Sequence, residues 1–148
     1  MNSRQQRESR NIILWRDSVA AGDDAFAPHE VTINIEYDES IEATLKKILA
    51  THYLPLIQGG KATWIVVGRK PMAVVAQQWL EPHYLVESTT RTEDLIGSAG
   101  DHHLEFMYWC QVEPGEVVKS LEQGSRLPDK YGARTVCDRV QAPCYQCL

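Results

Sequence analysis

The stretch VTINIEYDESIEATLKKILATH, residues 31–52, decides the fold class of this chain. In its first part, over 31–37, apolar residues alternate with polar ones, and this period of two predicts a half-buried antiparallel strand. Either Asp38 or Ser40 can then cap a helix by accepting a backbone N–H. Beyond them the apolar residues recur at helical spacing up to His52. A strand followed directly by an amphipathic helix indicates a domain that combines sheet and helix.

The same two periods recur along the rest of the chain. Strands are predicted over 11–15, 62–67, 72–78, 83–87 and 103–112, and a second helix follows Pro114 and ends at Gly124. The links between the later strands have hairpin length, which favours antiparallel pairing. We therefore predict an α+β fold with a mostly antiparallel sheet and two helices, near 40–52 and 115–123, packed on one face.

The length of 148 residues suits one domain with one core. We expect a single domain over 1–124 that begins with a loose arm, 1–10, and is followed by an irregular tail, 125–148. No apolar run approaches the roughly 20 residues that a bilayer requires, and the polar start has no secretory signal, so we expect a cytoplasmic protein that does not enter membranes. Three of the four cysteines crowd into the last twelve residues, which favours free thiols over a disulfide framework.

The charge is distributed unevenly. The chain carries a net −5, but residues 17–124 hold seventeen acids against seven bases, a net −10, whereas both ends are positive. Such a body repels nucleic-acid phosphates and anionic lipid and attracts basic partners. This excludes direct nucleic-acid binding and favours a basic protein partner.

Searches for catalytic and cofactor motifs are negative. There is no Gly-rich phosphate loop, no zinc-protease helix motif, no hydrolase nucleophile elbow and no EF-hand loop. Cys137, Cys144 and Cys147 resemble part of a zinc knuckle, but a fourth ligand is missing from the pattern. In a strand, His103 and Glu105 share one face and His102 points to the other, so the two histidines do not suit one ion. We therefore assign no catalytic residue, no metal and no cofactor.

Two features suggest a surface for a partner. The stretch DSVAAGDDAFAPH, residues 17–29, lacks periodicity and is dense in acids, and long loops of this kind are often functional. Tryptophans at strand ends, such as Trp79, or on the second face of a strand, such as Trp109, can anchor an interface. The predicted partner-binding residues are Asp17, Asp23, Asp24, Glu30, Trp79 and Trp109.

In its size, acidity, α+β character and lack of an active-site motif, the chain resembles small bacterial immunity proteins that neutralise a toxin in the cytosol, and the stretches DSVAAGDDAFAPH and GGKATWIVVG…PMAVVAQQW look like hallmarks of a family. The resemblance implies a non-enzymatic inhibitor that blocks the active or binding surface of a basic toxin. Two alternatives stay open. One is a small enzyme or ligand-binding domain with a pocket formed by loops 17–29 and 88–101, and the other is a zinc-stabilised adaptor that uses the C-terminal cysteines.

Overall fold

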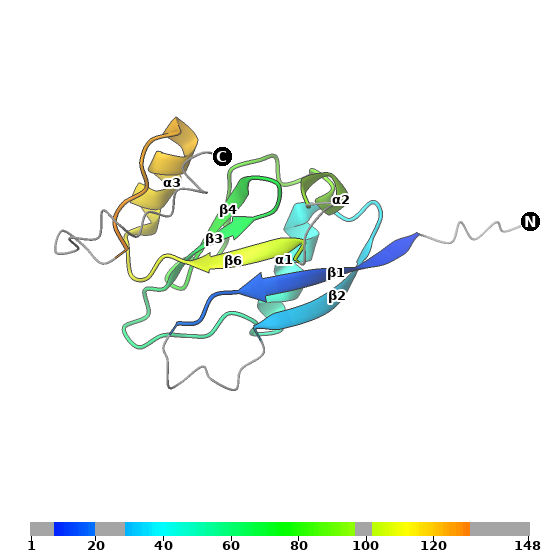
Figure 1. Ribbon diagram of the computed structural model, residues 1–148, viewed down its shortest axis with the longest axis horizontal. Coiled ribbons are helices and arrows are strands. Elements are labelled where there is room, and N and C mark those ends of the chain that lie inside the picture. Colours follow the sequence, from blue (N-terminus) through cyan, green and yellow to red (C-terminus); the bar gives the residue numbers. More distant parts are fainter. Residues whose placement is uncertain (1–7, 20–28, 97–101, 131–148) are drawn as a thin grey trace, which may run out of the picture.

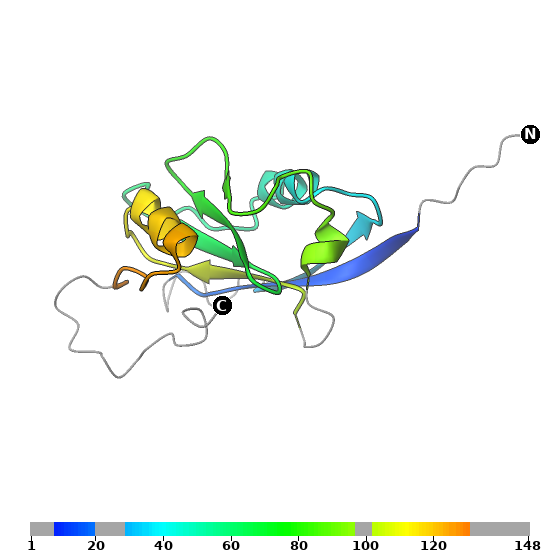
Figure 2. The same cartoon turned by 90° about the horizontal axis from the view of Figure 1, so that it is seen from above.

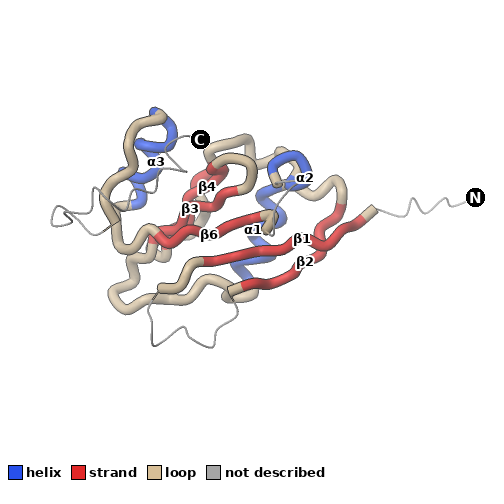
Figure 3. The backbone as a smooth tube through the Cα atoms, viewed as in Figure 1, coloured by secondary structure: helices blue, strands red, loops and turns tan. Residues whose placement is uncertain are grey.

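In residues 8–19, 29–96 and 102–130, which the computed structural model describes, the chain forms one six-stranded sheet and three helices (Figure 1). Figure 3 separates the two kinds of element by colour. The strands are β1 (Ser9–Arg16), β2 (Glu30–Glu36), β3 (Thr63–Val67), β4 (Pro71–Ala76), β5 (His83–Tyr84) and β6 (Leu104–Tyr108). The helices are α1 (Ile41–Ala50), α2 (Thr92–Leu95) and α3 (Pro114–Gln123). The prediction of an α+β fold is confirmed.

The strands follow the order β2-β1-β6-β3-β4-β5. Four of the five pairs in this described sheet are antiparallel, and the exception is β1 with β6, which run parallel with Leu14 opposite Leu104. The sheet is therefore mostly antiparallel, as predicted. Residues 9 and 10, which were expected in a loose arm, belong to β1.

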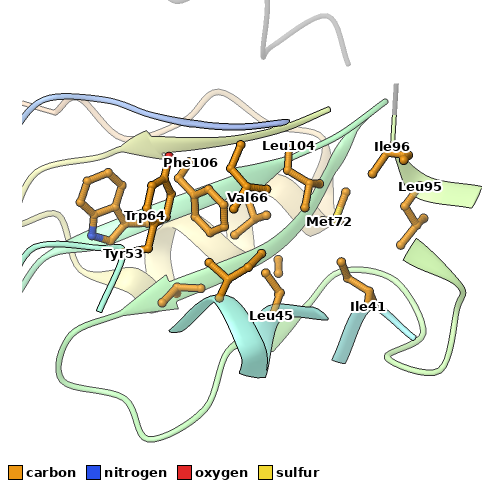
Figure 4. Close-up of a cluster of buried hydrophobic side chains, with 14 of the residues drawn as sticks. Ile41, Leu45, Tyr53, Trp64, Val66, Met72, Leu95, Ile96, Leu104 and Phe106 are labelled. Carbon is orange, nitrogen blue, oxygen red and sulfur yellow. The ribbon is translucent and has the colours of Figure 1, made fainter. Parts of the chain in front are cut away.

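The larger core lies between the sheet and the helix α1 (Figure 4). The Oγ of Ser40 accepts a hydrogen bond from the backbone N–H of Ala43 and so caps the helix at its first turn. Ile41, Leu45 and Ile48 then fall on one face, and each is at most 1% exposed. They pack against sheet residues that include Trp64, Val66 and Phe106.

A second, smaller core lies beneath α3 on the other face of the sheet. Ile65 and Val67 of β3 join Val117 and Val118 of α3 in this cluster, whereas Trp64 and Val66 belong to the core under α1. Successive residues of a strand point to opposite faces, so α1 and α3 lie on opposite faces. The prediction that both helices pack on one face is therefore wrong. The unbroken apolar run of β3, in which every residue is buried, reflects this coverage on both sides.

On the α3 side of the sheet, the described helices cover only part of the surface. The cluster beneath α3 draws its strand residues from β3, β4 and β6 and none from β1 or β2. Figures 1 and 2 show α3 at one end of the molecule, away from the outer part of β1 and β2. Ile13 and Trp15 of β1 are consequently only partly buried. We call this surface, formed by β1, β2 and the start of β6 opposite α1, the open face.

Residues 125–130 form neither helix nor strand, in keeping with the predicted irregular tail, but they pack against the domain. Leu127 is 6% exposed and belongs to the core beneath α3. None of the helices in the described part of the chain has the length and apolar character needed to cross a bilayer.

Candidate functional site

Trp15 lies near the end of β1, the middle strand of the open face. It lies opposite Glu30 in the antiparallel pairing of β1 with β2 and opposite Glu105 in the parallel pairing of β1 with β6. Residues directly opposite each other on neighbouring strands project to the same face of a sheet. Glu30, Trp15 and Glu105 therefore form a row across three strands, with the indole between two carboxylates.

Two imidazoles contact the indole of Trp15. The ring of His102 stacks on it, with ring centroids 5.0 Å apart and planes 24° apart, and the ring of His29 lies 5.7 Å away and is tilted. The Nε2 atom of His102 is 3.2 Å from Oε2 of Glu30, and its Nδ1 atom is 3.9 Å from Oε1 of Glu105. We call Trp15, His29, Glu30, His102 and Glu105 the Trp15 cluster.

The expectation that His102 points away from Glu105 is wrong. Strand alternation does not apply to His102, because β6 begins only at Leu104. The ring of His102 instead reaches over the open face, whereas His103 turns to the backbone of β1, where its Nδ1 accepts a hydrogen bond from the N–H of Ile13.

The chemistry of the Trp15 cluster favours binding of a cation over catalysis. Two carboxylates beside an aromatic ring suit a lysine or arginine side chain, through ion pairing and contact with the ring. His102 lies between them, but the contacts among the described residues bring no serine, cysteine or lysine side chain to it. Within the same residues there is no group of three or more His, Cys, Asp and Glu arranged to hold a metal ion.

Of the predicted partner-binding acids, Glu30 lies in the Trp15 cluster and Asp17 lies beside β6. The Oδ2 atom of Asp17 accepts a hydrogen bond of 3.0 Å from the backbone N–H of Tyr108, and the backbone N–H of Asp17 donates to the carbonyl of Phe106. Asp17 is only partly exposed, so it supports the sheet more than it presents a charge. Asp23 and Asp24 lie outside the described residues.

The two predicted tryptophan anchors have different surroundings. Trp109 is 4% exposed, its Nε1 donates to the carbonyl of Pro128 at 2.8 Å, and the Lys130 ammonium lies 4.5 Å from its ring centroid. It therefore fixes residues 128–130 to the domain and offers little surface to a partner. Trp79 packs partly buried against the core beneath α3, and the next residue, Leu80, is fully exposed.

Both alternative sites fall largely on parts of the chain that the structure does not describe. The loops proposed to form a pocket, 17–29 and 88–101, include residues 20–28 and 97–101, which lie outside the described ranges. Cys137, Cys144 and Cys147 lie outside them too. Cys110 is described, and burial raises the pKa of its thiol, which opposes formation of a reactive thiolate.

The importance of Trp15 was missed from sequence because it depends on strand register. Its place at the end of an apolar strand, just before the acidic stretch 17–29, was the available signal. That stretch lies far in sequence from His102 and Glu105, and the pairing of β1 with both β2 and β6 brings Glu30 and His102 together at Trp15.

No family model matches the chain, and neither the curated proteins nor the solved structures give a match.

Proposed function

We propose that this protein is a non-enzymatic inhibitor that holds a basic protein partner on its open face, in the manner of an immunity protein that neutralises a toxin. The observation that carries the proposal is the row Glu30–Trp15–Glu105. Two carboxylates flank a partly buried indole on a part of the sheet that no described helix covers. Partly buried tryptophan is a frequent anchor of protein interfaces, and the carboxylates give it a preference for cationic side chains.

The distribution of basic residues supports this choice. The side chains that β1 and β2 direct to the open face include no lysine or arginine, because Arg10 and Arg16 fall on the alternate positions of β1. On the α1 side, by contrast, acids are paired with bases, as in Lys47 with Glu39 and Lys46 with Glu42. Among the described residues, Glu30 and Glu105 contact the imidazole of His102 and no lysine or arginine, so a basic partner can still pair with these two carboxylates.

The charge of the whole domain supports the same role. The net −10 of residues 17–124 attracts a basic protein over a distance, and such steering accelerates encounter by a factor that falls with ionic strength. Toxins that act on nucleic acids carry basic surfaces to approach phosphate. An acidic inhibitor that covers such a surface blocks the substrate directly.

The test compares two double variants with equal charge change. Glu30→Gln with Glu105→Gln alters the Trp15 cluster, and Glu81→Gln with Glu87→Gln alters the opposite edge of the sheet, beside β5. Wild type and both variants serve as baits in the lysate of the native host, and association rates of the captured protein are then measured at low and high salt. We expect a basic partner whose association with the first variant is slowed about ten-fold at low salt, with a smaller effect at high salt.

All four carboxylates are at least partly exposed, so both variants should fold normally. Equal rates for the two double variants, or a captured partner that is acidic, would contradict the proposal.

A further inference from the structure

Among the strands of the described residues, β2 is at the edge of the sheet and pairs only with β1. The backbone N–H of Arg16 donates to the carbonyl of His29, and the N–H of Tyr37 donates to the carbonyl of Glu8. This register makes the odd-numbered residues of β2 the ones that bond to β1. The N–H and C=O groups of Glu30, Thr32, Asn34 and Glu36 therefore point outward.

One end of this edge is closed by α1 and the turn before it. Lys47 donates from Nζ to the carbonyl of Asn34 at 2.8 Å, and the N–H of Glu36 donates to Oε2 of Glu39 at 3.2 Å. At the other end, the N–H groups of Glu30, Thr32 and Asn34 and the carbonyls of Glu30 and Thr32 meet no partner among the described residues. An edge with such groups is a template for a further strand.

We infer that the outer edge of β2, from Glu30 to Asn34, takes an extended basic segment of the partner as an added strand. This inference rests on the proposed function for the charge of the partner and adds the mode of binding. The side chains of Glu30, Thr32 and Asn34 all project to the open face, so alternate residues of an added strand would continue that face. A lysine or arginine opposite Glu30 would make a favourable cross-strand pair beside Trp15.

The charges of β2 disfavour a second copy of this chain as the occupant. In the antiparallel register with the greatest overlap, two copies of β2 would place Glu30 of each copy opposite Glu36 of the other. Like charges directly opposite each other destabilise a strand pair. A basic strand would instead place positive side chains opposite these glutamates.

The sharpest test uses the pair of variants Thr32→Pro and Thr32→Ala. Proline removes the outward N–H of residue 32, which β1 does not use, and proline is tolerated at edge positions of this kind. Alanine removes the side chain but keeps the N–H. The probe is a short synthetic peptide in which lysine alternates with valine, and its matched control carries glutamate in place of lysine.

We expect the lysine peptide to bind wild type and Thr32→Ala with similar affinity and Thr32→Pro about ten-fold more weakly, because backbone hydrogen bonds are lost. The glutamate peptide should not bind. Amide hydrogen exchange on the wild-type protein gives a second measurement that does not depend on a variant. The amides of Glu30, Thr32 and Asn34 should exchange rapidly in the free protein and become protected when the lysine peptide binds.

Several outcomes would overturn the inference. This edge does not receive the segment if the lysine peptide binds Thr32→Pro as tightly as it binds wild type. The same conclusion follows if the peptide protects amides elsewhere on the sheet, or if the amides of β2 are already protected from exchange in the free protein. A wild-type dimer that Thr32→Pro converts to a monomer would assign the edge to a second copy instead. If lysine peptide binding depends on Glu30 and Glu105 but not on residue 32, the inference fails and the proposed function stands. If no basic probe or protein binds, both fail.

Discussion

The Nδ1 atom of His103 accepts a hydrogen bond of 2.8 Å from the backbone N–H of Ile13, which joins the residue before β6 to the middle of β1. The acceptor role requires that Nδ1 carry no proton, and the Nε2 atom of the same ring lies 3.2 Å from Nη2 of Arg10. Burial and the nearby Arg10 guanidinium lower the pKa of His103 below the ordinary value of 6.5. Protonation would break this hydrogen bond and place a second cation beside Arg10.

The first prediction follows from this lowered pKa. At a pH between the ordinary pKa of histidine and the lower pKa of His103 in the folded protein, the unfolded chain binds more protons than the folded protein. The contribution of His103 to stability is therefore complete above about pH 6.5. It is lost as the pH falls through the pKa of the folded state. In His103→Asn the amide oxygen can replace Nδ1 as acceptor and does not titrate. Urea unfolding over this range should show a smaller loss of stability on acidification in His103→Asn than in wild type. Identical pH dependence would assign the loss to other groups.

Asp17 should contribute to stability, although the charge density of its segment first suggested a binding role. Asp17→Ala leaves the N–H of Tyr108 without its acceptor, and we expect the free energy of unfolding to fall by about 1–2 kcal/mol. Asp17→Asn keeps an acceptor oxygen and should lose less. Urea denaturation of both variants decides the matter, since a pure charge effect would make the two losses equal.

Gly68 should be sensitive to the smallest side chain. A Cβ atom at this position would lie 2.3 Å from the carbonyl oxygen of Leu95, which already accepts a hydrogen bond from the N–H of Arg69. We expect Gly68→Ala to destabilise the protein by about 1–3 kcal/mol in thermal or urea unfolding. Gly115→Ala is the control, because its Cβ would meet nothing closer than 3.9 Å. A neutral Gly68→Ala would mean that α2 can move away from the hairpin of β3 and β4 at little cost.

Trp109 should act in folding and not in partner binding. Trp109→Phe keeps an aromatic ring in the core but loses the donor to the carbonyl of Pro128, at a cost of about 1 kcal/mol in unfolding free energy. Trp79→Phe, in the same cluster, removes no hydrogen bond to another described residue, so it should lower the free energy of unfolding by less. The dissociation rate of the partner should be unchanged in Trp109→Phe, and an increased rate would return Trp109 to the interface.

The elements that sequence predicts well are those whose pattern is local. The strand predicted over 31–37 and the helix predicted after Ser40 appear in the structure close to their predicted bounds, whereas the strand predicted over 103–112 ends at Tyr108. The face that each helix covers depends on packing between segments far apart in the chain. Even so, the unbroken apolar run of β3 contained a usable signal, because a strand covered on one side alone would alternate.

The candidate site was harder to predict, since it depends on register. Glu30 was recognised from its acidic neighbourhood, but Trp15 and Glu105 join it only through pairing across β2, β1 and β6. The parallel pairing of β1 with β6 joins residues 90 positions apart, such as Leu14 and Leu104, and no local periodicity reports it. The role of Asp17 depends on a single hydrogen bond to that same strand.

The parallel pairing also has a consequence for the order of assembly during translation. β1 and β2 leave the ribosome early and can form their hairpin at once, but β1 meets β6 only after most of the domain has been synthesised. Contacts of such high sequence separation slow folding because a long loop must close first. Until then the edge of β1 that β6 will cover is unsatisfied, so the nascent chain passes through a stage in which premature association competes with completion of the sheet.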